Sequence, residues 1–376
     1  MQSGELLRKF SGHTIGVVTS LFSPDGQYLL TLDFAGIMRL WQTRALNGLP
    51  QFIGHTAGVE TAAISPDGKL VVTGGMDNVA RLWNAETGEQ VRVLQGHTSY
   101  INWVAISPDG KRLLTAGWDD NTARLWDMQT GKEIHRFDFA GRVLSVAISP
   151  DGRYAIMSVG STLPVFDLLT YTQVYTLTTG SVQKDAAEGV TFSPDSKYAL
   201  SAGMDSIARL WDMSTGKQVR EFKGHAGGIY MAIFSPDGKY LLTSGFDKTA
   251  RLWDVATGQE VRRFVGHSGE VLGVAFSHDG KLVATTSGDN TARIWDVATG
   301  KELRSLQGHS AAVWWVAFSP DNKSVVTASD DGTARTWYVD YHDEMNYLCG
   351  KLLRDFTDAE RAQFEIKDNT PTCPAK

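Results

Sequence analysis

The sequence predicts an all-β protein, and three observations lead to this prediction. The tetrapeptide Ser-Pro-Asp-Gly, or a close variant, begins at residues 23, 65, 107, 149, 193, 235, 277 and 319, with a spacing of 42 residues except for one step of 44. The segments between these turns are short and alternate between apolar and polar residues. Residues 1–337 contain no segment with sustained helical periodicity. A fixed period of this size indicates a repeat architecture.

Each repeat has the same four elements in the same order. In the seventh repeat, four alternating runs separated by turns cover residues 271–276, 281–286, 291–295 and 301–306. The turns are rich in Gly, Asp, Asn and Pro, which end strands and form tight connections. Each repeat is therefore predicted to be a four-stranded antiparallel sheet, with strands a to d in chain order.

One such sheet cannot bury both of its faces, so the repeated sheets must stack against one another. Radial stacking gives a β-propeller, in which ring closure leaves only short, protected edges. The eighth repeat stops after three strands at Trp337-Tyr338, and residues 3–10 match the fourth strand of the seventh repeat, residues 299–306. We therefore predict an eight-bladed propeller over residues 1–338, closed by the N-terminal strand pairing with the strand that ends at Trp337.

Two recurring dipeptides connect these repeats with a known family. Gly-His stands at residues 12–13, 54–55, 96–97, 224–225, 266–267 and 308–309. Each pair is followed by Trp-Asp, or by a variant such as Trp41-Gln42 or Trp83-Asn84. The repeats resemble the WD-repeat, or β-transducin-like, family of propellers, and the resemblance covers residues 3–338. It implies the same propeller fold.

The resemblance also implies a role for the repeated polar residues. In that family the His, a Ser or Thr of strand b, the turn Asp and the strand-c Trp form hydrogen bonds inside each blade. A closed network of this kind satisfies buried polar groups and makes the blade rigid. The matching sets are His55-Thr73-Asp77-Trp83, His225-Thr243-Asp247-Trp253, His267-Thr285-Asp289-Trp295 and His309-Thr327-Asp331-Trp337. The third repeat has His97, Thr115 and Trp126, with either Asp119 or Asp120 as the acid.

Three repeats depart from the pattern. The first has Ala35 in the Asp position, with Asp33 close by. The fourth lacks Gly-His and ends in Phe166-Asp167, and the fifth replaces Gly-His with the longer stretch 178–188. Two interpretations stay open: blades four and five are less rigid and residues 178–188 form a specialised surface, or the repeats have simply drifted.

Composition and motifs argue against several function classes. Thirty-six Lys and Arg against 42 Asp and Glu give a net charge of −6 without a basic block, so neither nucleic acid nor a membrane surface is expected as a partner. No signal peptide or membrane span is visible, which favours a cytoplasmic location. Cys349 and Cys373 can pair or react, but free, reduced thiols are favoured there. No cofactor or metal motif is found, and no enzyme is predicted.

The last 38 residues, 339–376, have a different pattern. Apolar residues recur at helical spacing from Met345 to Phe356, and a capping box begins at Thr357. We predict a helical tail whose apolar stripe packs on the propeller, or alternatively binds a partner. The ending is similar to the tails that close WD-repeat domains of large bacterial signalling proteins. Such a likeness implies a sensor or recruiting role, either as a separate subunit or as the C-terminal part of a longer protein.

The leading functional hypothesis is a non-catalytic scaffold or sensor that binds a protein or peptide. The alternatives are an enzyme with its site at the central channel and an architectural subunit that uses the blade edges. Turns on the bottom face are nearly uniform, whereas the d–a and b–c loops of the top face vary from blade to blade. The predicted partner-binding residues are Glu60, Met76, Tyr100, Asn102, Trp118, Met204, Tyr230, Phe246, Glu270, Leu272 and Trp314. The oligomeric state stays open.

Four tryptophans do not end a blade. The alternation of the strands places Trp118 and Trp314 toward the top surface, and Trp103 and Trp315 in the packing between blades. Apolar and aromatic side chains ringed by Glu suit a protein segment with some positive charge. The alternative is that these residues only cover the core beneath them.

Overall fold

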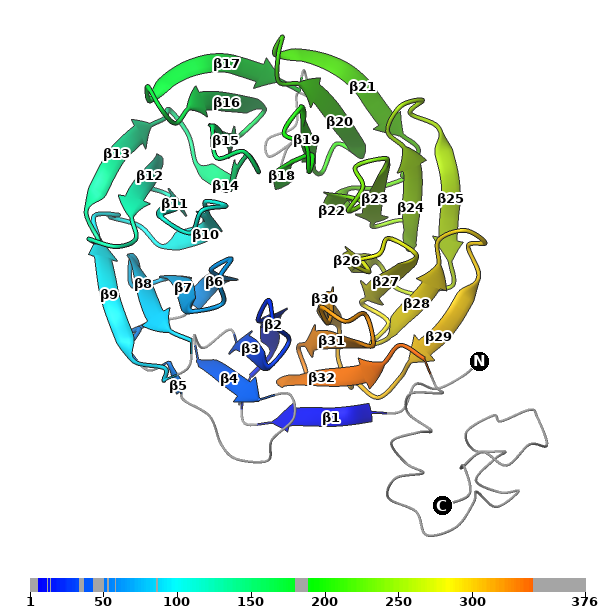
Figure 1. Ribbon diagram of the computed structural model, residues 1–376. Helices are drawn as coiled ribbons and strands as arrows, with labels where there is room; N and C mark the ends of the chain where they lie inside the picture. The colour runs from blue at the N-terminus through cyan, green and yellow to red at the C-terminus, as the bar shows by residue number, and fades with distance from the viewer. Residues whose placement is uncertain are drawn as a thin grey trace, which may run out of the picture.

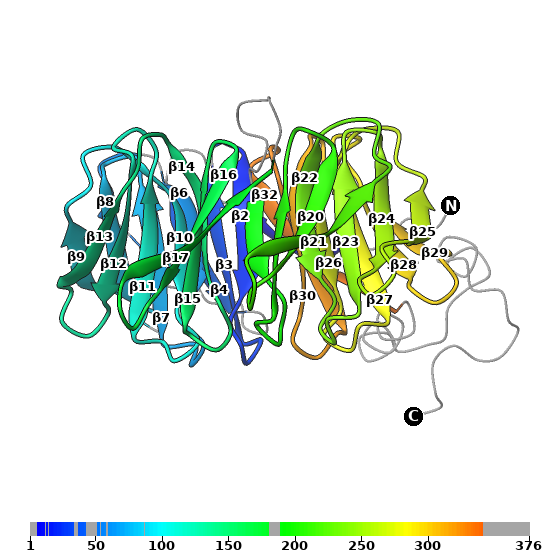
Figure 2. The ribbon, with the colours of Figure 1, turned by 90° about the horizontal axis from the view of Figure 1, so that it is seen from above.

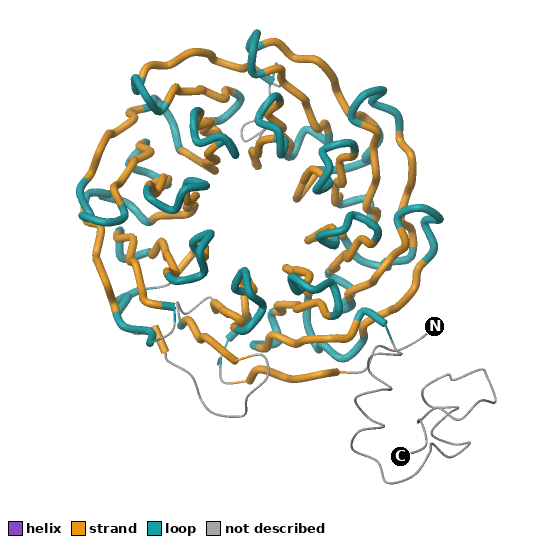
Figure 3. The backbone as a smooth tube through the Cα atoms, in the orientation of Figure 1, coloured by secondary structure: helices purple, strands orange, loops and turns teal. Residues whose placement is uncertain are grey.

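Eight four-stranded antiparallel sheets are arranged radially around a central channel, with strand a of each sheet innermost and strand d outermost (Figure 1). The computed structural model describes residues 6–340 apart from 12, 14, 34–36, 43–50, 53, 58, 86 and 180–188, with the backbone alone for 6–9, 11, 40, 42, 51 and 52. Within this part of the chain every regular element is a strand (Figure 3). The predicted helices after residue 340 lie outside it, so the boundary between propeller and tail stays a prediction.

The first four blades follow one another in sequence. Blade 1 contains β2 (Val17–Phe22), β3 (Tyr28–Asp33), β4 (Met38–Gln42) and β5 (Gln51–Phe52). Blade 2 contains β6 (Val59–Ile64), β7 (Leu70–Gly75), β8 (Val79–Asn84) and β9 (Gln90–Gln95). Blade 3 contains β10 (Ile101–Ile106), β11 (Arg112–Gly117), β12 (Thr122–Asp127) and β13 (Glu133–Asp138). Blade 4 contains β14 (Val143–Ile148), β15 (Tyr154–Val159), β16 (Thr162–Asp167) and β17 (Thr172–Thr178).

The remaining blades repeat this order until the last. Blade 5 contains β18 (Gly189–Phe192), β19 (Tyr198–Ala202), β20 (Ile207–Asp212) and β21 (Lys217–Lys223). Blade 6 contains β22 (Ile229–Phe234), β23 (Tyr240–Gly245), β24 (Thr249–Asp254) and β25 (Glu260–Val265). Blade 7 contains β26 (Val271–Phe276), β27 (Leu282–Ser287), β28 (Ala292–Asp296) and β29 (Glu302–Leu306). Blade 8 contains β30 (Val313–Phe318), β31 (Ser324–Ser329), β32 (Thr333–Tyr338) and β1 (Leu6–Ser11).

The outer strand of blade 8 comes from the start of the chain. β1 pairs antiparallel with β32, with Phe10 opposite Ala334 and Ser11 opposite Thr333. Phe10 is 1% exposed and belongs to a cluster with Val17 of blade 1 and Val326 of blade 8. The N-terminal strand therefore contributes both a sheet edge and a core side chain at the junction of the first and last blades.

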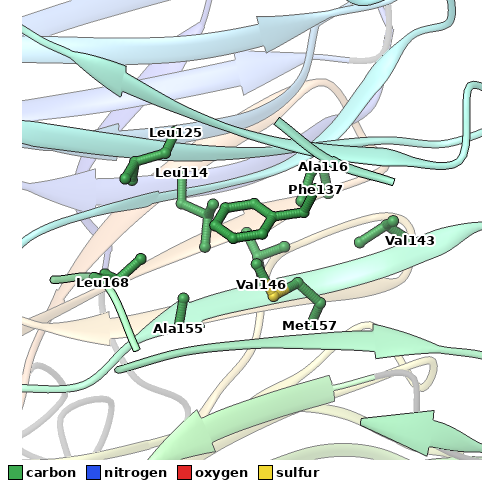
Figure 4. Packing of buried hydrophobic residues seen from close by; sticks show 10 residues of the cluster. Leu114, Ala116, Leu125, Phe137, Val143, Val146, Ala155, Met157 and Leu168 are labelled. Carbon is green, nitrogen blue, oxygen red and sulfur yellow. The ribbon is translucent and has the colours of Figure 1, made fainter. Parts of the chain in front are cut away.

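The core is divided into layers between neighbouring blades. Figure 4 shows one layer, in which Leu114 and Phe137 of blade 3 pack against Val146 and Met157 of blade 4. Seen from the side, the strands run between two faces of the ring that consist of loops and turns (Figure 2). Rigid blade-to-blade packing thus fixes the positions of the loops on both faces. In the part of the chain that the structure describes, no helix is long and apolar enough to span a membrane.

Strand a carries a β-bulge at its second residue in seven blades. The register with strand b shifts there, for example between Val59 and Thr61 in blade 2 and between Val313 and Trp315 in blade 8. A bulge leaves one residue out of the regular pairing and changes the direction of its side chain. The bulged residues include five of the predicted site residues, namely Glu60, Asn102, Tyr230, Leu272 and Trp314.

Candidate functional site

The repeated polar residues form one hydrogen-bond network in each of several blades. In blade 6, His225 Nδ1 lies 2.9 Å from Asp247 Oδ1, and its Nε2 lies 2.8 Å from Thr243 Oγ1. The indole N–H of Trp253 donates to the same Thr243 oxygen at 2.9 Å. Blades 2, 7 and 8 have the same contacts, which confirms the four predicted sets.

In blade 3, Asp120 is the network acid. Its Oδ2 lies 2.6 Å from His97 Nδ1, and its Oδ1 accepts the Thr122 hydroxyl. Asp119 instead forms an exposed ion pair with Arg142 at 2.6 Å. The structure thereby settles which of the two neighbouring carboxylates belongs to the blade.

Blade 1 completes its network from a different backbone position. Asp33 Oδ2 lies 2.6 Å from His13 Nδ1, although the usual acid position is taken by Ala35. Asp33 aligns with Gly75 of blade 2, where an added Cβ would meet the His55 imidazole and lie 2.6 Å from Asp77 Oδ1. The carboxylate can therefore reach the imidazole from the end of strand b as well as from the turn.

Blades 4 and 5 differ from the others, as their sequences predict. In blade 5, Trp211 still donates to Ser201 at 3.0 Å, and Asp205 forms an ion pair with Arg209 at 2.7 Å. Strand c of blade 4 has Phe166 in the Trp position, and the phenyl ring has no N–H to donate. Of the predicted specialised surface at 178–188, only Thr178 and Thr179 are among the described residues.

An arginine of strand c joins the networks, and the sequence analysis missed it. Arg81 pairs with Asp77 at 2.6 Å, and Arg251 bridges Asp247 and Glu260, each at 2.8 Å. The signal was present, because Arg stands two residues before the strand-c Trp in every repeat except the fourth. This arginine connects strand c to the turn acid and to strand d.

In blades 2 and 6, electrostatics favour a neutral imidazole beside an ionised carboxylate. In blade 3, burial alone would raise the pKa of Asp120, but its interactions with His97, Thr98 and Thr122 outweigh burial and lower that pKa to about 2. Burial lowers the pKa of His55 and His225. A neutral ring can donate from Nδ1 to the Asp and accept at Nε2 from the Thr hydroxyl, which accepts the indole N–H. The networks thus use their polar groups internally.

Four of the predicted site residues form an apolar patch on the top face, consisting of Met204, Tyr230, Phe246 and Trp314. The Tyr230 ring centroid lies 4.3 Å from that of Phe246 and 6.3 Å from that of Trp314. Met204 lies close to the rings, because both Met204 and Phe246 pack around Gly228. A Cβ added at Gly228 would lie 2.7 Å from the Met204 sulfur and 3.6 Å from the Phe246 ring. The patch extends from blade 5 to blade 8, and all four side chains are half-buried.

A second group, the acidic aromatic cluster, consists of Glu60, Tyr100, Trp118, Asp119 and Arg142 from blades 2, 3 and 4. The rings of Tyr100 and Trp118 are stacked, with centroids 5.6 Å apart and planes 21° apart. The guanidinium carbon of Arg142 lies 5.3 Å from the Trp118 ring centroid. This group holds three more of the predicted site residues.

The other four predicted residues belong to neither group. Asn102 donates to the Leu144 carbonyl at 2.7 Å and so connects blades 3 and 4. Leu272, at 6% exposure, is buried. Met76, at 48%, and Glu270 are exposed. A partner-binding role for any of the eleven residues stays a prediction.

The expected position of Trp103 requires a correction. This side chain was predicted to lie between blades, but it is 39% exposed on the innermost strand β10. The bulge does not account for this exposure, because the same bulge precedes Trp315 in blade 8. Trp315, by contrast, packs against the buried cluster between blades 8 and 1, as predicted.

Gly273 allows β26 and β30 to approach closely beneath the patch. A Cβ at this position would lie 2.6 Å from the Trp314 carbonyl oxygen and 2.7 Å from Thr286 Oγ1. We expect Gly273→Ala to lower the free energy of unfolding by about 1–3 kcal/mol, because the strand must move. Urea titration measures this loss. The control Gly288→Ala has no atom nearer than 4.0 Å and should change little; equal effects of the two variants would contradict the close-packing argument.

Eight radial four-stranded sheets, six of which have a His-Thr-Asp-Trp network, define the class of protein as a β-propeller. The family model of the WD domain, G-beta repeat, matches residues 4–42, 48–84, 88–127, 172–212, 216–254, 258–296 and 300–338. The chain therefore belongs to the WD-repeat family. The unmatched residues 128–171 include β14, β15 and β16 of blade 4, whose repeat lacks Gly-His.

Two individual proteins are also similar. The "probable di- and tripeptidase DUG2" of Saccharomyces cerevisiae is 32% identical over an alignment of 94 residues that covers 23% of this chain and 11% of that protein. The chain thus spans about a tenth of the length of that relative. The crystal structure of the computationally designed Ika8 protein superposes with a TM-score of 0.80 and 25% identity, over 89% of this chain and 100% of that one.

Proposed function

We propose that the chain is a non-catalytic platform that binds a protein or peptide segment on its top face, as the recognition part of a larger bacterial signalling assembly in the cytoplasm. WD-repeat propellers generally bind proteins or peptides. The similarity of the C-terminal sequence to the tails of bacterial signalling proteins supports the signalling part of this proposal.

The apolar patch is the observation that carries the proposal. Its aromatic rings contact one another across blades 6 and 8, while Leu272 of the intervening blade 7 is buried. Half-buried aromatic side chains with a polar surround are typical of the energetic centre of a protein interface. In contrast, the polar residues that a catalytic site would need are engaged in the blade networks, once in each of several blades.

The test is a variant in which Trp118, Tyr230 and Phe246 are all replaced by Ala. Each truncation should weaken partner binding by about 2 kcal/mol, as for aromatic hot spots, which is roughly 30-fold per residue. Affinity capture from the native host, followed by hydrogen exchange on the complex, identifies the partner and the protected face. The fold should persist, because none of the three side chains belongs to a blade network.

A matched control distinguishes the top face from the blade edges. Val91, Val219 and Leu303 are exposed on the outer strands β9, β21 and β29. Their triple replacement by Ala removes apolar surface at the edges and should leave partner binding unchanged. Full retention of the partner by the folded top-face variant, with loss in the edge variant, would refute the proposal and favour an architectural role.

A further inference from the structure

We propose that Glu60, together with the stacked rings of Tyr100 and Trp118, forms a subsite for an arginine side chain of the bound peptide. This inference rests on the proposed function and specifies the chemistry of the partner. The occupant is a guanidinium that bonds to the Glu60 carboxylate and lies against the aromatic pair.

The Glu60 carboxylate, half-buried at the bulge of β6, makes no hydrogen bond or ion pair with any of the described residues. Half-buried glutamates elsewhere in the ring do have partners: Glu260 and Glu302 each pair with an arginine of strand c. Burial raises the pKa of Glu60, so its charge is held at a cost in the free protein. A cation at this position would offset that cost.

Glu60 and Tyr100 lie at neighbouring places in blades 2 and 3. A Cβ added at Gly74 would lie 2.9 Å from Cγ2 of Thr61, which follows Glu60, and 2.5 Å from Cγ2 of Ile101, which follows Tyr100. Burial, and then the negative charges of Glu60 and Asp119, raise the pKa of the Tyr100 hydroxyl. Tyr100 is also the ring that stacks on Trp118. A cation close to Glu60 would therefore be near two aromatic faces, and their negative electrostatic potential attracts cations.

The same cluster already holds one guanidinium of the chain itself. Arg142 lies over the Trp118 ring at 5.3 Å, and its Nε donates to Asp119 at 2.6 Å. The Arg142 guanidinium, the Trp118 ring and the Asp119 carboxylate thus form one complete set. Glu60 and Tyr100 supply a second carboxylate and ring, and the partner would supply the matching guanidinium. This argument favours arginine, whose planar group both stacks and forms paired hydrogen bonds.

The two top-face groups lie on different sides of the channel. The acidic aromatic cluster belongs to blades 2 to 4, whereas the apolar patch belongs to blades 5, 6 and 8. Strands β6 and β10 lie across the channel from β22 and β30 (Figure 1). One extended peptide can therefore place an arginine on the first group and an apolar segment on the second.

The test compares two capped tripeptides, acetyl-Gly-Arg-Gly-amide and acetyl-Gly-citrulline-Gly-amide, which differ in charge but hardly in shape. Protein labelled with ¹⁵N at tryptophan reports binding through the indole N–H of Trp118, which is assigned by its absence in Trp118→Phe. The arginine peptide should shift this resonance saturably. The citrulline peptide should bind about tenfold more weakly, and Glu60→Gln should weaken arginine binding by about the same factor.

Asp330→Asn is the matched control, because it removes one negative charge from an exposed turn of the same face in blade 8. It should change the affinity less than twofold. Equal binding of the two peptides, equal loss in Asp330→Asn and Glu60→Gln, or no shift at all would overturn the inference. Since Glu60→Gln leaves the apolar patch intact, capture of a partner through that patch would then still support the proposed function by itself.

Discussion

Deletion of residues 1–11 is expected to lower the melting temperature by about 10 °C or more. In a large domain, each kcal/mol lost from the free energy of unfolding lowers the melting temperature by about 2–4 °C. The deletion removes β1, so that β32 becomes an unpaired edge. It also removes Phe10, whose burial between blades 8 and 1 is worth about 3–5 kcal/mol by comparison with other Phe→Ala changes in cores. Scanning calorimetry of the full and shortened chains measures the effect.

Phe10→Ala separates the two contributions to this effect. It keeps the backbone pairs of β1 with β32 and removes only the buried ring. The deletion should therefore be more destabilising than the point variant. A melting temperature that does not change on deletion would refute closure by the N-terminal strand, and equal losses in the two proteins would limit its contribution to the Phe10 side chain.

Acidification is expected to lower the free energy of unfolding in two stages. Burial lowers the pKa values of His55 and His225 in the folded protein, so these side chains take up protons near pH 6.5 only in the unfolded chain. The free energy of unfolding therefore falls as the pH drops below about 6.5. The second stage comes from the network aspartates. Hydrogen bonds lower the pKa values of Asp120, Asp247, Asp289 and Asp331 against the opposing effect of burial, so their stabilisation is complete above pH 3.8 and lost below it.

Asp120 alone should contribute on the order of 2 kcal/mol at neutral pH, from the difference between its usual pKa of 3.8 and its value of about 2. Urea titrations at a series of pH values measure the total. Asp120→Asn should lower stability at pH 7 and reduce the loss below pH 4. A free energy of unfolding that is constant from pH 7 to pH 3 would contradict this account of the networks.

Periodicity was enough to predict the eight sheets, because every repeat has to form the same turns and bury the same faces. The blade networks, by contrast, were implied by the resemblance to the WD-repeat family, whose His, Thr, Asp and Trp positions these repeats match. Two details needed coordinates. Asp33 reaches His13 from the end of strand b, the position that Gly75 occupies in the second repeat, and not from the turn. Trp103 and Trp315 follow the same bulge in their repeats, but Trp103 is 39% exposed and Trp315 packs on a buried cluster, so the outcome depends on the surrounding side chains.

Comparing the repeats was enough to select the top-face residues as candidates. It could not predict which of them lie together in the apolar patch and in the acidic aromatic cluster. Tyr230 and Trp314 lie two blades apart in the chain, and their contact depends on how far the ring turns from one blade to the next. Leu272 has the same place in its repeat and is buried. Equivalent sequence positions therefore have different exposure, because each neighbour has a different size.

The bulge in strand a has a consequence for molecular evolution and for engineering. It gives each of seven blades one residue that neither pairs in the ladder nor belongs to a His-Thr-Asp-Trp set. These residues in the present chain are Val18, Glu60, Asn102, Leu144, Tyr230, Leu272 and Trp314. Leu144 and Leu272 are buried, and Asn102 connects blades 3 and 4, whereas Val18, Glu60, Tyr230 and Trp314 are half-buried. A library randomised at Val18, Glu60, Tyr230 and Trp314 is expected to explore new ligands while the elements that hold each blade together stay constant.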